Sequence, residues 1–145
     1  MGVQKYFSEA DKLQITNAIR VAETNTSGEI RVHIENKCTD DVLDRAAYIF
    51  EKLEMHKTAL RNGVLFYLAL EDRKFAILGD GGINQKVSED FWESTKEVIL
   101  AKFKEGNISE GLADGIIKAG EQLKVHFPYQ EDDVNELSDD ISFGK

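Results

Sequence analysis

Residues 63–70 read GVLFYLAL, an unbroken apolar run behind an opening glycine. A run of this length and composition predicts a central β-strand that is covered on both faces by other parts of the chain. Four polar residues, 71–74, follow it before a second apolar stretch begins at Phe75. So short a connection permits an antiparallel hairpin but no crossover to a parallel strand. The sequence therefore predicts that a strand at 63–70 pairs with a strand at 75–78.

A third strand is predicted upstream, at residues 29–35, where apolar and polar residues alternate. Alternation indicates a strand with one buried face, here the face that carries Ile30, Val32 and Ile34. Elsewhere the apolar residues recur at helical spacing. The helices predicted in this way cover residues 9–24, 42–54, 87–103 and a last segment between Gly106 and Leu123. The order α-β-α-β-β-α-α predicts a small sheet with helices on both faces.

The length of 145 residues corresponds to one ordinary domain, since domains hold about 100–200 residues. We predict a globular body at residues 7–127 and an acidic C-terminal extension at residues 128–145. Six acidic residues in the extension favour a solvated segment. Four apolar residues are nevertheless able to anchor it to the body: Val134, Leu137, Ile141 and Phe143.

The charge and the cysteine content exclude several classes of protein. The chain has 18 basic and 27 acidic residues, a net charge of −9 with neutral histidines. Such a surface repels phosphodiester backbones and anionic lipids, so we predict neither nucleic acid nor membrane as a partner. Cys38 is the single cysteine, which makes an intrachain disulfide impossible. Because no apolar run is long enough for a signal peptide or a bilayer span, the expected location is the cytoplasm.

The predicted topology brings three polar residues to one edge of the sheet. If the first two strands run parallel, linked by the helix between them, the hairpin returns the chain to the edge where both strands begin. Glu29, Asn62 and Asp80 then lie along that edge. Two carboxylates and an amide carbonyl are hard oxygen ligands, which suit Ca²⁺ or Mg²⁺ better than Zn²⁺. We interpret this edge as a candidate divalent-metal site.

The glycine-rich turn around Asp80 has two other interpretations. Gly79-x-Gly81-x-x-Asn84 superficially suggests a dinucleotide fingerprint. It lacks the third glycine, follows a hairpin strand rather than opening a βαβ unit, and places Asp80 where it would repel a pyrophosphate. The structural interpretation is a tight strand-to-helix turn in which Asp80 serves only as a cap.

The opposite edge of the sheet competes with this candidate site. Ligands of open α/β sheets usually bind at the carboxyl ends of the strands. The predicted topology places four acidic residues there: Asp40, Asp41, Glu71 and Asp72. Acidic loops and charged hairpin tips are also ordinary solvated surface, which is the structural interpretation of this cluster.

Several catalytic templates fail on spacing. Cys38 and Arg45 are one residue too far apart for a C-x5-R phosphatase loop, and no G-x-S-x-G, Walker A or D-x-D sequence occurs. The three histidines, His33, His56 and His126, lack the spacing of a zinc site. We interpret His33, on a strand face, as structural.

The strand and turn motifs together resemble the TPM domain family. The stretches that carry this resemblance are SGEIRV at 27–32, RNGVL at 61–65, DRKFAI at 72–77, GDGGI at 79–83, FKEG at 103–106 and EGL at 110–112. Their order and spacing cover residues 7–127. The resemblance implies a three-layer α/β/α sandwich of Rossmann-like appearance. The family includes thylakoid-lumen proteins linked to photosystem repair, and some members are described as divalent-metal-dependent acid phosphatases with bound calcium.

Residues and resemblance together predict a Ca²⁺- or Mg²⁺-dependent phosphatase that acts on small phosphomonoesters. Glu29, Asn62 and Asp80 are the predicted metal ligands, and Asp80 is also predicted to be catalytic through the metal. His56 is the predicted proton donor to the leaving oxygen, because imidazole titrates near neutral pH. The alternative is a non-catalytic calcium-binding or protein-interaction module. No motif specifies a nucleophile or a protein partner.

Overall fold

The computed structural model describes residues 3–130 and 137–144. Within them the helical elements are η1 (Val3–Tyr6), α1 (Glu9–Asn25), α2 (Val42–Lys52), α3 (Gly81–Asn84), α4 (Glu93–Lys104) and α5 (Ile108–Leu123). The strands are β1 (Glu29–Glu35), β2 (Gly63–Ala69), β3 (Lys74–Gly79) and β4 (Ser142–Phe143). They form one mixed sheet in the order β3-β2-β1-β4. Strand β1 runs parallel to β2 and β4, whereas β2 and β3 are antiparallel, as their short connection predicts. None of the described helices is both long and apolar enough to cross a membrane.

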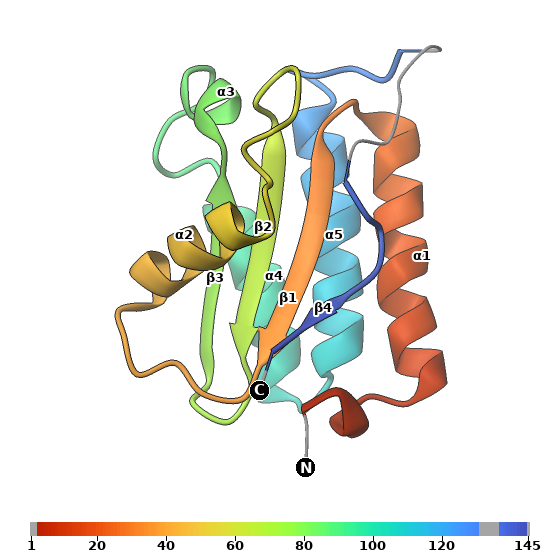
Figure 1. Cartoon of the computed structure of the whole chain (residues 1–145). Coiled ribbons are helices and arrows are strands. Elements are labelled where there is room, and N and C mark those ends of the chain that lie inside the picture. Colours follow the sequence, from red (N-terminus) through yellow and green to blue (C-terminus); the bar gives the residue numbers. More distant parts are fainter. Residues whose placement is uncertain (1–2, 131–136, 145) are drawn as a thin grey trace.

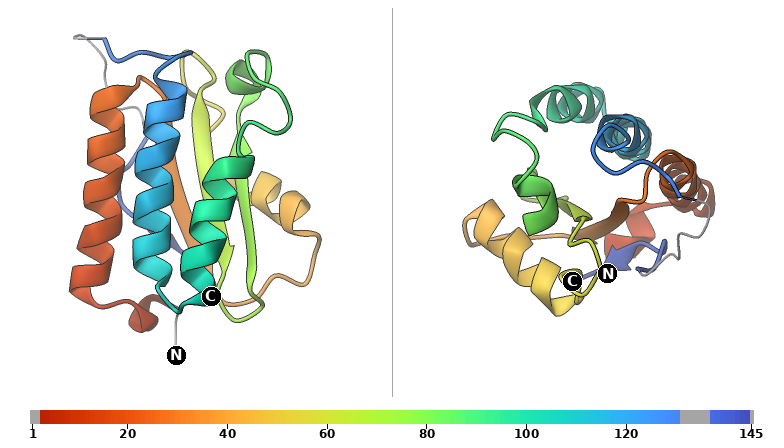
Figure 2. Two further views of the ribbon diagram at one scale, coloured as in Figure 1. Left: turned by 180° about the vertical axis from the view of Figure 1, so that it is seen from behind. Right: turned by 90° about the horizontal axis from the view of Figure 1, so that it is seen from above.

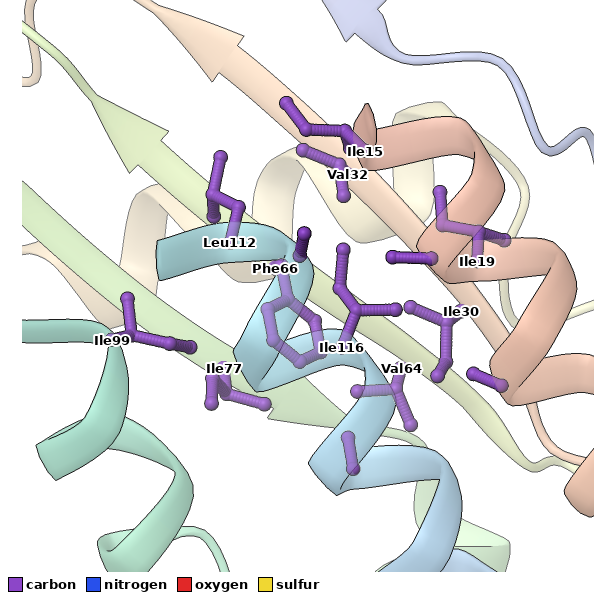
Figure 3. Packing of buried hydrophobic residues seen from close by; sticks show 14 of the residues in the cluster. Ile15, Ile19, Ile30, Val32, Val64, Phe66, Ile77, Ile99, Leu112 and Ile116 are labelled. Atoms are coloured by element: carbon purple, nitrogen blue, oxygen red, sulfur yellow. The ribbon is translucent and has the colours of Figure 1, made fainter. Parts of the chain in front are cut away.

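Helices cover both faces of the sheet. Helices α1, α5 and α4 lie in a row on one face, and α2 covers the other (Figures 1 and 2). The larger apolar cluster fills the space under the row of three helices, and Figure 3 shows Phe66 of β2 beside Ile116 of α5 within it. A smaller cluster lies between α2 and the sheet. The predicted α/β fold, a three-layer α/β/α sandwich with a small mixed sheet, is confirmed.

Strand β2 is buried along its whole length, as its continuous apolar sequence predicts. Strand β1 differs from the prediction of one buried face. Its apolar residues are buried, but Glu29, His33 and Glu35 are buried as well. The second face of β1 is covered because side chains from other elements bond to the polar residues on it. Arg45, from α2, bonds to Glu35, and Ser142, from β4, bonds to His33.

The predicted helix at 87–103 begins later than expected. Residues 81–84 form the short helix α3, turns follow, and α4 starts only at Glu93. Ser88 explains the delay, because its hydroxyl donates to the carboxylate of Asp90 and its carbonyl accepts the N–H of Phe91. Such local bonds offer the backbone an alternative to the helix. Val87 and Phe91 nevertheless pack against the larger apolar cluster, so they contribute to the core without being helical.

The C-terminal segment adds the fourth strand to the sheet. Ser142 pairs with His33 and Phe143 with Ile34, and the Gly144 N–H donates to the carbonyl of Ile34 over 2.8 Å. Ile141 and Phe143 pack against the larger apolar cluster and Leu137 against the smaller one. Three of the four predicted anchors therefore contact the body, and Val134 lies outside the described residues. Figure 1 shows this segment running along the outer side of β1.

Candidate functional site

The backbone brings the three predicted ligands together where β1 and β2 begin. Glu29 is the ladder partner of Gly63, and its N–H donates to the carbonyl of Asn62 over 3.2 Å. On the other side of β2, the N–H of Asp80 donates to the carbonyl of Gly63 over 2.9 Å. Glu29, Asn62 and Asp80 are therefore neighbours along one edge of the sheet. We call these three residues the amino edge.

Asp80 is held by a bidentate ion pair with Arg61. Arg61 Nε and Nη2 donate to the two carboxylate oxygens over 2.8 Å each, and the Gly81 N–H donates to Oδ1 over 2.7 Å. Burial opposes the ionisation of Asp80, but these hydrogen bonds outweigh it and hold the pKa of the carboxyl below its usual range. Arg61 has a φ of 51°, a left-handed conformation that is uncommon outside glycine. Strain of this kind gathers at functional sites.

Asn62 and Glu29 are both buried, with 2% and 4% of their surface exposed. The Nδ2 atom of Asn62 donates to the carbonyl of Ser27 over 3.2 Å, and Oε1 of Glu29 accepts the N–H of Leu137 over 3.0 Å. With its nitrogen engaged in this way, the amide of Asn62 presents its oxygen to any further partner.

His56 lies in the loop between α2 and β2, near enough to Asp80 for a charge on its imidazole to favour the ionised carboxylate and so lower the pKa of Asp80. Its Nδ1 atom is buried and has no hydrogen-bond partner among the described residues. A buried polar atom in this state costs free energy unless a ligand, an ion or a proton acceptor satisfies it. Lys57, the next residue, is exposed and pairs with Glu54 at 3.0 Å instead.

The glycine-rich turn packs directly against this loop. The Gly82 N–H donates to the carbonyl of Arg61 over 2.9 Å, and a Cβ atom at Gly82 would lie only 2.2 Å from the carbonyl oxygen of Leu60. Only glycine fits so close an approach. Asp80 is also the N-cap of α3, through Gly81. The structural interpretation of the turn thus accounts for two of its residues without a nucleotide.

The donor types at the amino edge are those that a divalent cation prefers. Two carboxylates and an amide oxygen are hard ligands. The guanidinium of Arg61 already occupies both oxygens of Asp80, so a cation would have to displace it. In the described part of the chain, no three His, Cys, Asp or Glu side chains are grouped so that they could hold a metal ion. Glu29 and Asp80 would therefore be the only carboxylate ligands. A site with two carboxylates suits Mg²⁺ better than Ca²⁺, because proteins usually hold Mg²⁺ with one or two carboxylates together with water and substrate phosphate.

The acidic residues of the opposite edge have local structural roles. Asp41 is the N-cap of α2, where it accepts two backbone N–H groups. Asp72 accepts the N–H of Cys38 over 2.7 Å, and Glu71 lies 3.9 Å from Lys37 at the surface. These contacts explain Asp41 as a helix cap and Asp72 as part of a loop closure, and Asp40 is exposed.

A buried hydrogen-bond network at that opposite edge was missed by the sequence analysis. Glu35, the last residue of β1, accepts bonds of 2.8 and 3.0 Å from Arg45 and a further bond from the hydroxyl of Tyr67. His33 Nε2 lies 3.1 Å from Glu35 Oε1, and His33 Nδ1 lies 2.8 Å from Ser142 Oγ. We call these five residues the Glu35 network. It borders a cavity of about 750 Å³.

The network has a defined protonation state at neutral pH. Burial opposes the ionisation of Glu35, but the bonds from Arg45, Tyr67 and His33 outweigh it and lower the pKa of Glu35 to about 2. Burial also lowers the pKa of His33, so its ring is neutral at pH 7. One signal of this network was present in the sequence: His33 and Glu35 are two residues apart, so they share the polar face of a strand.

Comparisons with known proteins agree with this architecture. A family model described as the TPM domain matches residues 3–122. The BA42 protein from the psychrophilic bacterium Bizionia argentinensis has 49% sequence identity and a TM-score of 0.92, with 98% of each chain covered. The N-terminal domain of a P. gingivalis protein has 16% identity and a TM-score of 0.71, covering 86% of this chain and 82% of that one.

A third structure, the N-terminal domain of the cg2496 protein from Corynebacterium glutamicum, has 13% identity and a TM-score of 0.64, covering 99% of this chain and 83% of that one. The last two likenesses concern the fold alone. No curated protein matches the chain. Since the family model spans most of the sequence and includes Glu29, His56, Asn62 and Asp80, the chain belongs to the TPM domain family.

Proposed function

We propose that the chain is a divalent-metal-dependent phosphoric-monoester hydrolase that works at the amino edge. The observation that carries this proposal is the Asp80 carboxylate, buried, ionised and held by the half-exposed guanidinium of Arg61 beside a second buried carboxylate. Residues whose pKa is shifted by burial and by a charged partner gather at functional sites, and also in structural ion pairs. Membership of the TPM domain family supports the proposal, because the resemblance links that domain to metal-dependent acid phosphatases.

In this proposal Glu29 and Asp80 hold the cation through their carboxylates and Asn62 through its amide oxygen. The donor count favours Mg²⁺, with Ca²⁺ as the alternative ion. When bound, the cation would offset phosphate charge and make water a better nucleophile. The amino edge supplies no side-chain nucleophile, and none is required for attack by water.

Arg61 and His56 have separate roles in the proposal. A cation on Asp80 would release the Arg61 guanidinium, whose planar donors match two oxygens of a phosphate. His56 is proposed to donate a proton to the leaving oxygen, because its imidazole lies near enough to Asp80 to act on that carboxylate. The substrate class is a small phosphomonoester.

A non-catalytic metal-binding or protein-interaction module is the second candidate. The observation that favours it is the complete satisfaction of Asp80, whose two oxygens accept bonds from Arg61 and Gly81. The close approach of Gly82 to the neighbouring loop likewise has a structural explanation. In this case the amino edge is a rigid turn.

Hydrolysis of 4-nitrophenyl phosphate by purified protein separates the two candidates. We expect chelation to abolish turnover and added Mg²⁺ to restore it. Asp80→Asn should lower kcat by 10²-fold or more at saturating metal, and His56→Ala by about 10²-fold. The matched control is Asp40→Asn, an exposed aspartate of the opposite edge that should retain wild-type activity. Activity that persists in chelator and in Asp80→Asn would overturn the proposal, and absence of activity with either metal would leave the module interpretation in its place.

A further inference from the structure

The cavity beside the Glu35 network lies outside the proposed function. Its volume of about 750 Å³ is within the range of small-molecule sites, about 300–1,000 Å³. Its lining residues come from the end of β1, from α2 and from the C-terminal strand β4. Ile49, Leu53 and Phe143 give it an apolar side, while His33 and Ser142 give it a polar one. Apolar walls with a few converging polar groups are the usual form of a ligand site.

The charges around the cavity favour an anion. Its lining includes the cations Lys37, Arg45 and Lys52 and the anions Glu35 and Glu71, a net charge of +1 on a chain whose net charge is −9. Arg45 is paired with Glu35, and Lys37 is only loosely paired with Glu71 at 3.9 Å. Lys52 forms no ion pair with any described residue, although its charge reaches His33 and acts to lower the pKa of that ring. Two ammonium groups are therefore open to a ligand.

The hydrogen-bond chain through His33 determines what Ser142 can do. Glu35 is ionised and cannot donate, so the neutral ring of His33 must carry its proton on Nε2, which faces Glu35 Oε1 at 3.1 Å. Its Nδ1 then accepts the hydroxyl proton of Ser142 over 2.8 Å. Because the hydroxyl proton of Ser142 is bonded to His33, only the lone pairs of Ser142 Oγ are available to a ligand in the cavity. A partner must donate to it, as a hydroxyl group would.

The position of Ser142 is fixed by the backbone around it. A Cβ atom at Gly144 would lie 2.7 Å from Glu35 Oε1 and 3.1 Å from His33 Nε2, so glycine allows the chain to lie directly on the network. The Gly144 N–H donates to the carbonyl of Ile34 over 2.8 Å and is not available as a donor to a reacting oxyanion. This arrangement suits recognition by Ser142 better than nucleophilic catalysis.

We propose that the cavity binds a small organic anion that carries a hydroxyl group, with its anionic oxygens facing Lys37 and Lys52 and its hydroxyl donating to Ser142 Oγ. The anionic group is a carboxylate or a phosphate-type group. The site stands on residues that take no part in the amino edge, so it does not depend on the proposed hydrolase activity.

Two matched pairs of probes test the proposal by ¹⁵N-¹H NMR titration of the whole chain. Mandelate and phenylacetate differ by one hydroxyl, and hydroxy(phenyl)methylphosphonate and benzylphosphonate repeat that difference with a non-hydrolysable phosphonate. For fragments of this size we expect Kd on the order of 1 mM. Shifts should centre on the end of β1 and on β4, and the hydroxylated member of the favoured pair should bind about fivefold more tightly.

Variants assign the recognition to named groups. Ser142→Ala should abolish the preference for the hydroxylated probe while leaving the Kd of its partner within about twofold, and Ser142→Thr should keep the preference. The double variant Lys37→Glu with Lys52→Glu should raise the Kd of both members of the favoured pair about tenfold or more. Lys104→Glu with Lys124→Glu, an equal charge change at two exposed lysines outside the cavity, is the control. Shifts centred elsewhere, a preference that survives Ser142→Ala, or equal effects of the cavity and control lysines would each refute the site.

Discussion

Replacing Glu35 by glutamine removes the charge on which its network depends while nearly preserving the shape of the side chain. Glu35 accepts bonds from Arg45, Tyr67 and His33, and 4% of its side chain is exposed. The pKa of the carboxyl falls from 4.5 to about 2 in the folded protein. Each unit of pKa difference corresponds to about 1.4 kcal/mol, so this difference contributes roughly 3 kcal/mol to the stability of the fold at pH 7. Breaking a buried ion pair costs about 3–5 kcal/mol, and the 30% exposure of Arg45 places the expected loss at the lower end.

The pH dependence gives this prediction its sign. Because the folded-state pKa is depressed, the contribution of Glu35 is fully present above its unfolded pKa of 4.5 and is lost as the pH falls toward 2. At pH 3 a little under half of it should remain. Glu35→Gln should therefore cost roughly 3 kcal/mol at pH 7 and about half as much at pH 3.

Urea unfolding followed by circular dichroism at both pH values measures the two differences. Comparing the wild type with the variant at each pH cancels the titration of the other carboxylates. Glu71→Gln, a change of the same type at an exposed residue, should cost less than about 1 kcal/mol at either pH. A loss in Glu35→Gln that is the same at pH 7 and pH 3 would show that the ionised carboxylate does not stabilise the fold.

Three further outcomes follow from other parts of the molecule. Gly82→Ala should lower the free energy of unfolding by about 1–3 kcal/mol, because the added Cβ would lie 2.2 Å from the Leu60 carbonyl oxygen. Gly81→Ala is the control, since open space surrounds that position, and it should change the free energy of unfolding by less than about 0.5 kcal/mol. Ser8→Ala should cost about 1 kcal/mol in chemical unfolding, because it removes the capping box of α1. Mg²⁺ at a hundredfold excess over its Kd should stabilise the wild type by about 2.7 kcal/mol in thermal melts and Asp80→Asn by much less; equal gains in both would contradict a role for Asp80 in binding.

Much of the fold could be predicted because its determinants are local. The apolar run at 63–70 and the four-residue connection after it were enough to predict a buried strand and an antiparallel partner, and both are present. The amino edge followed from the same reasoning, since strand direction alone decides which residues meet at an edge. The predicted start of α4 was wrong. A turn that contains Ser88 and Asp90 competes with helical hydrogen bonds, although apolar residues at helical spacing continue through it.

The cavity at the other edge could not be predicted in this way. Ser142 and His33 are 109 residues apart in the chain, and nothing in the spacing of either residue indicates that they meet. Their contact requires β4 to join the sheet, and a two-residue strand is too short to have a recognisable alternation. His33 was interpreted as structural for a sound reason, because a histidine on a strand face is more often satisfied within the core than used by a ligand.

The two edges therefore differ in how the chain builds them, and this difference decides how each can be tested. At the amino edge, backbone bonds fix Asp80 to Gly63 of β2 and Asn62 to Glu29 of β1, so a side-chain substitution there leaves these bonds in place. At the other edge, Ser142 is held by the pairing of β4 with β1 and by the close approach of Gly144 to Glu35. A change that weakens this docking removes a wall of the cavity, while Asp80 and Asn62 keep their backbone bonds to β2 and β1. Glu29 links the two edges, because its Oε1 accepts the N–H of Leu137 from the same C-terminal segment. Gly144→Ala, whose Cβ would meet Glu35 and His33, should therefore weaken binding of a hydroxylated anion more than it lowers turnover of a phosphomonoester. Equal losses in both would contradict two separate sites on one small sheet.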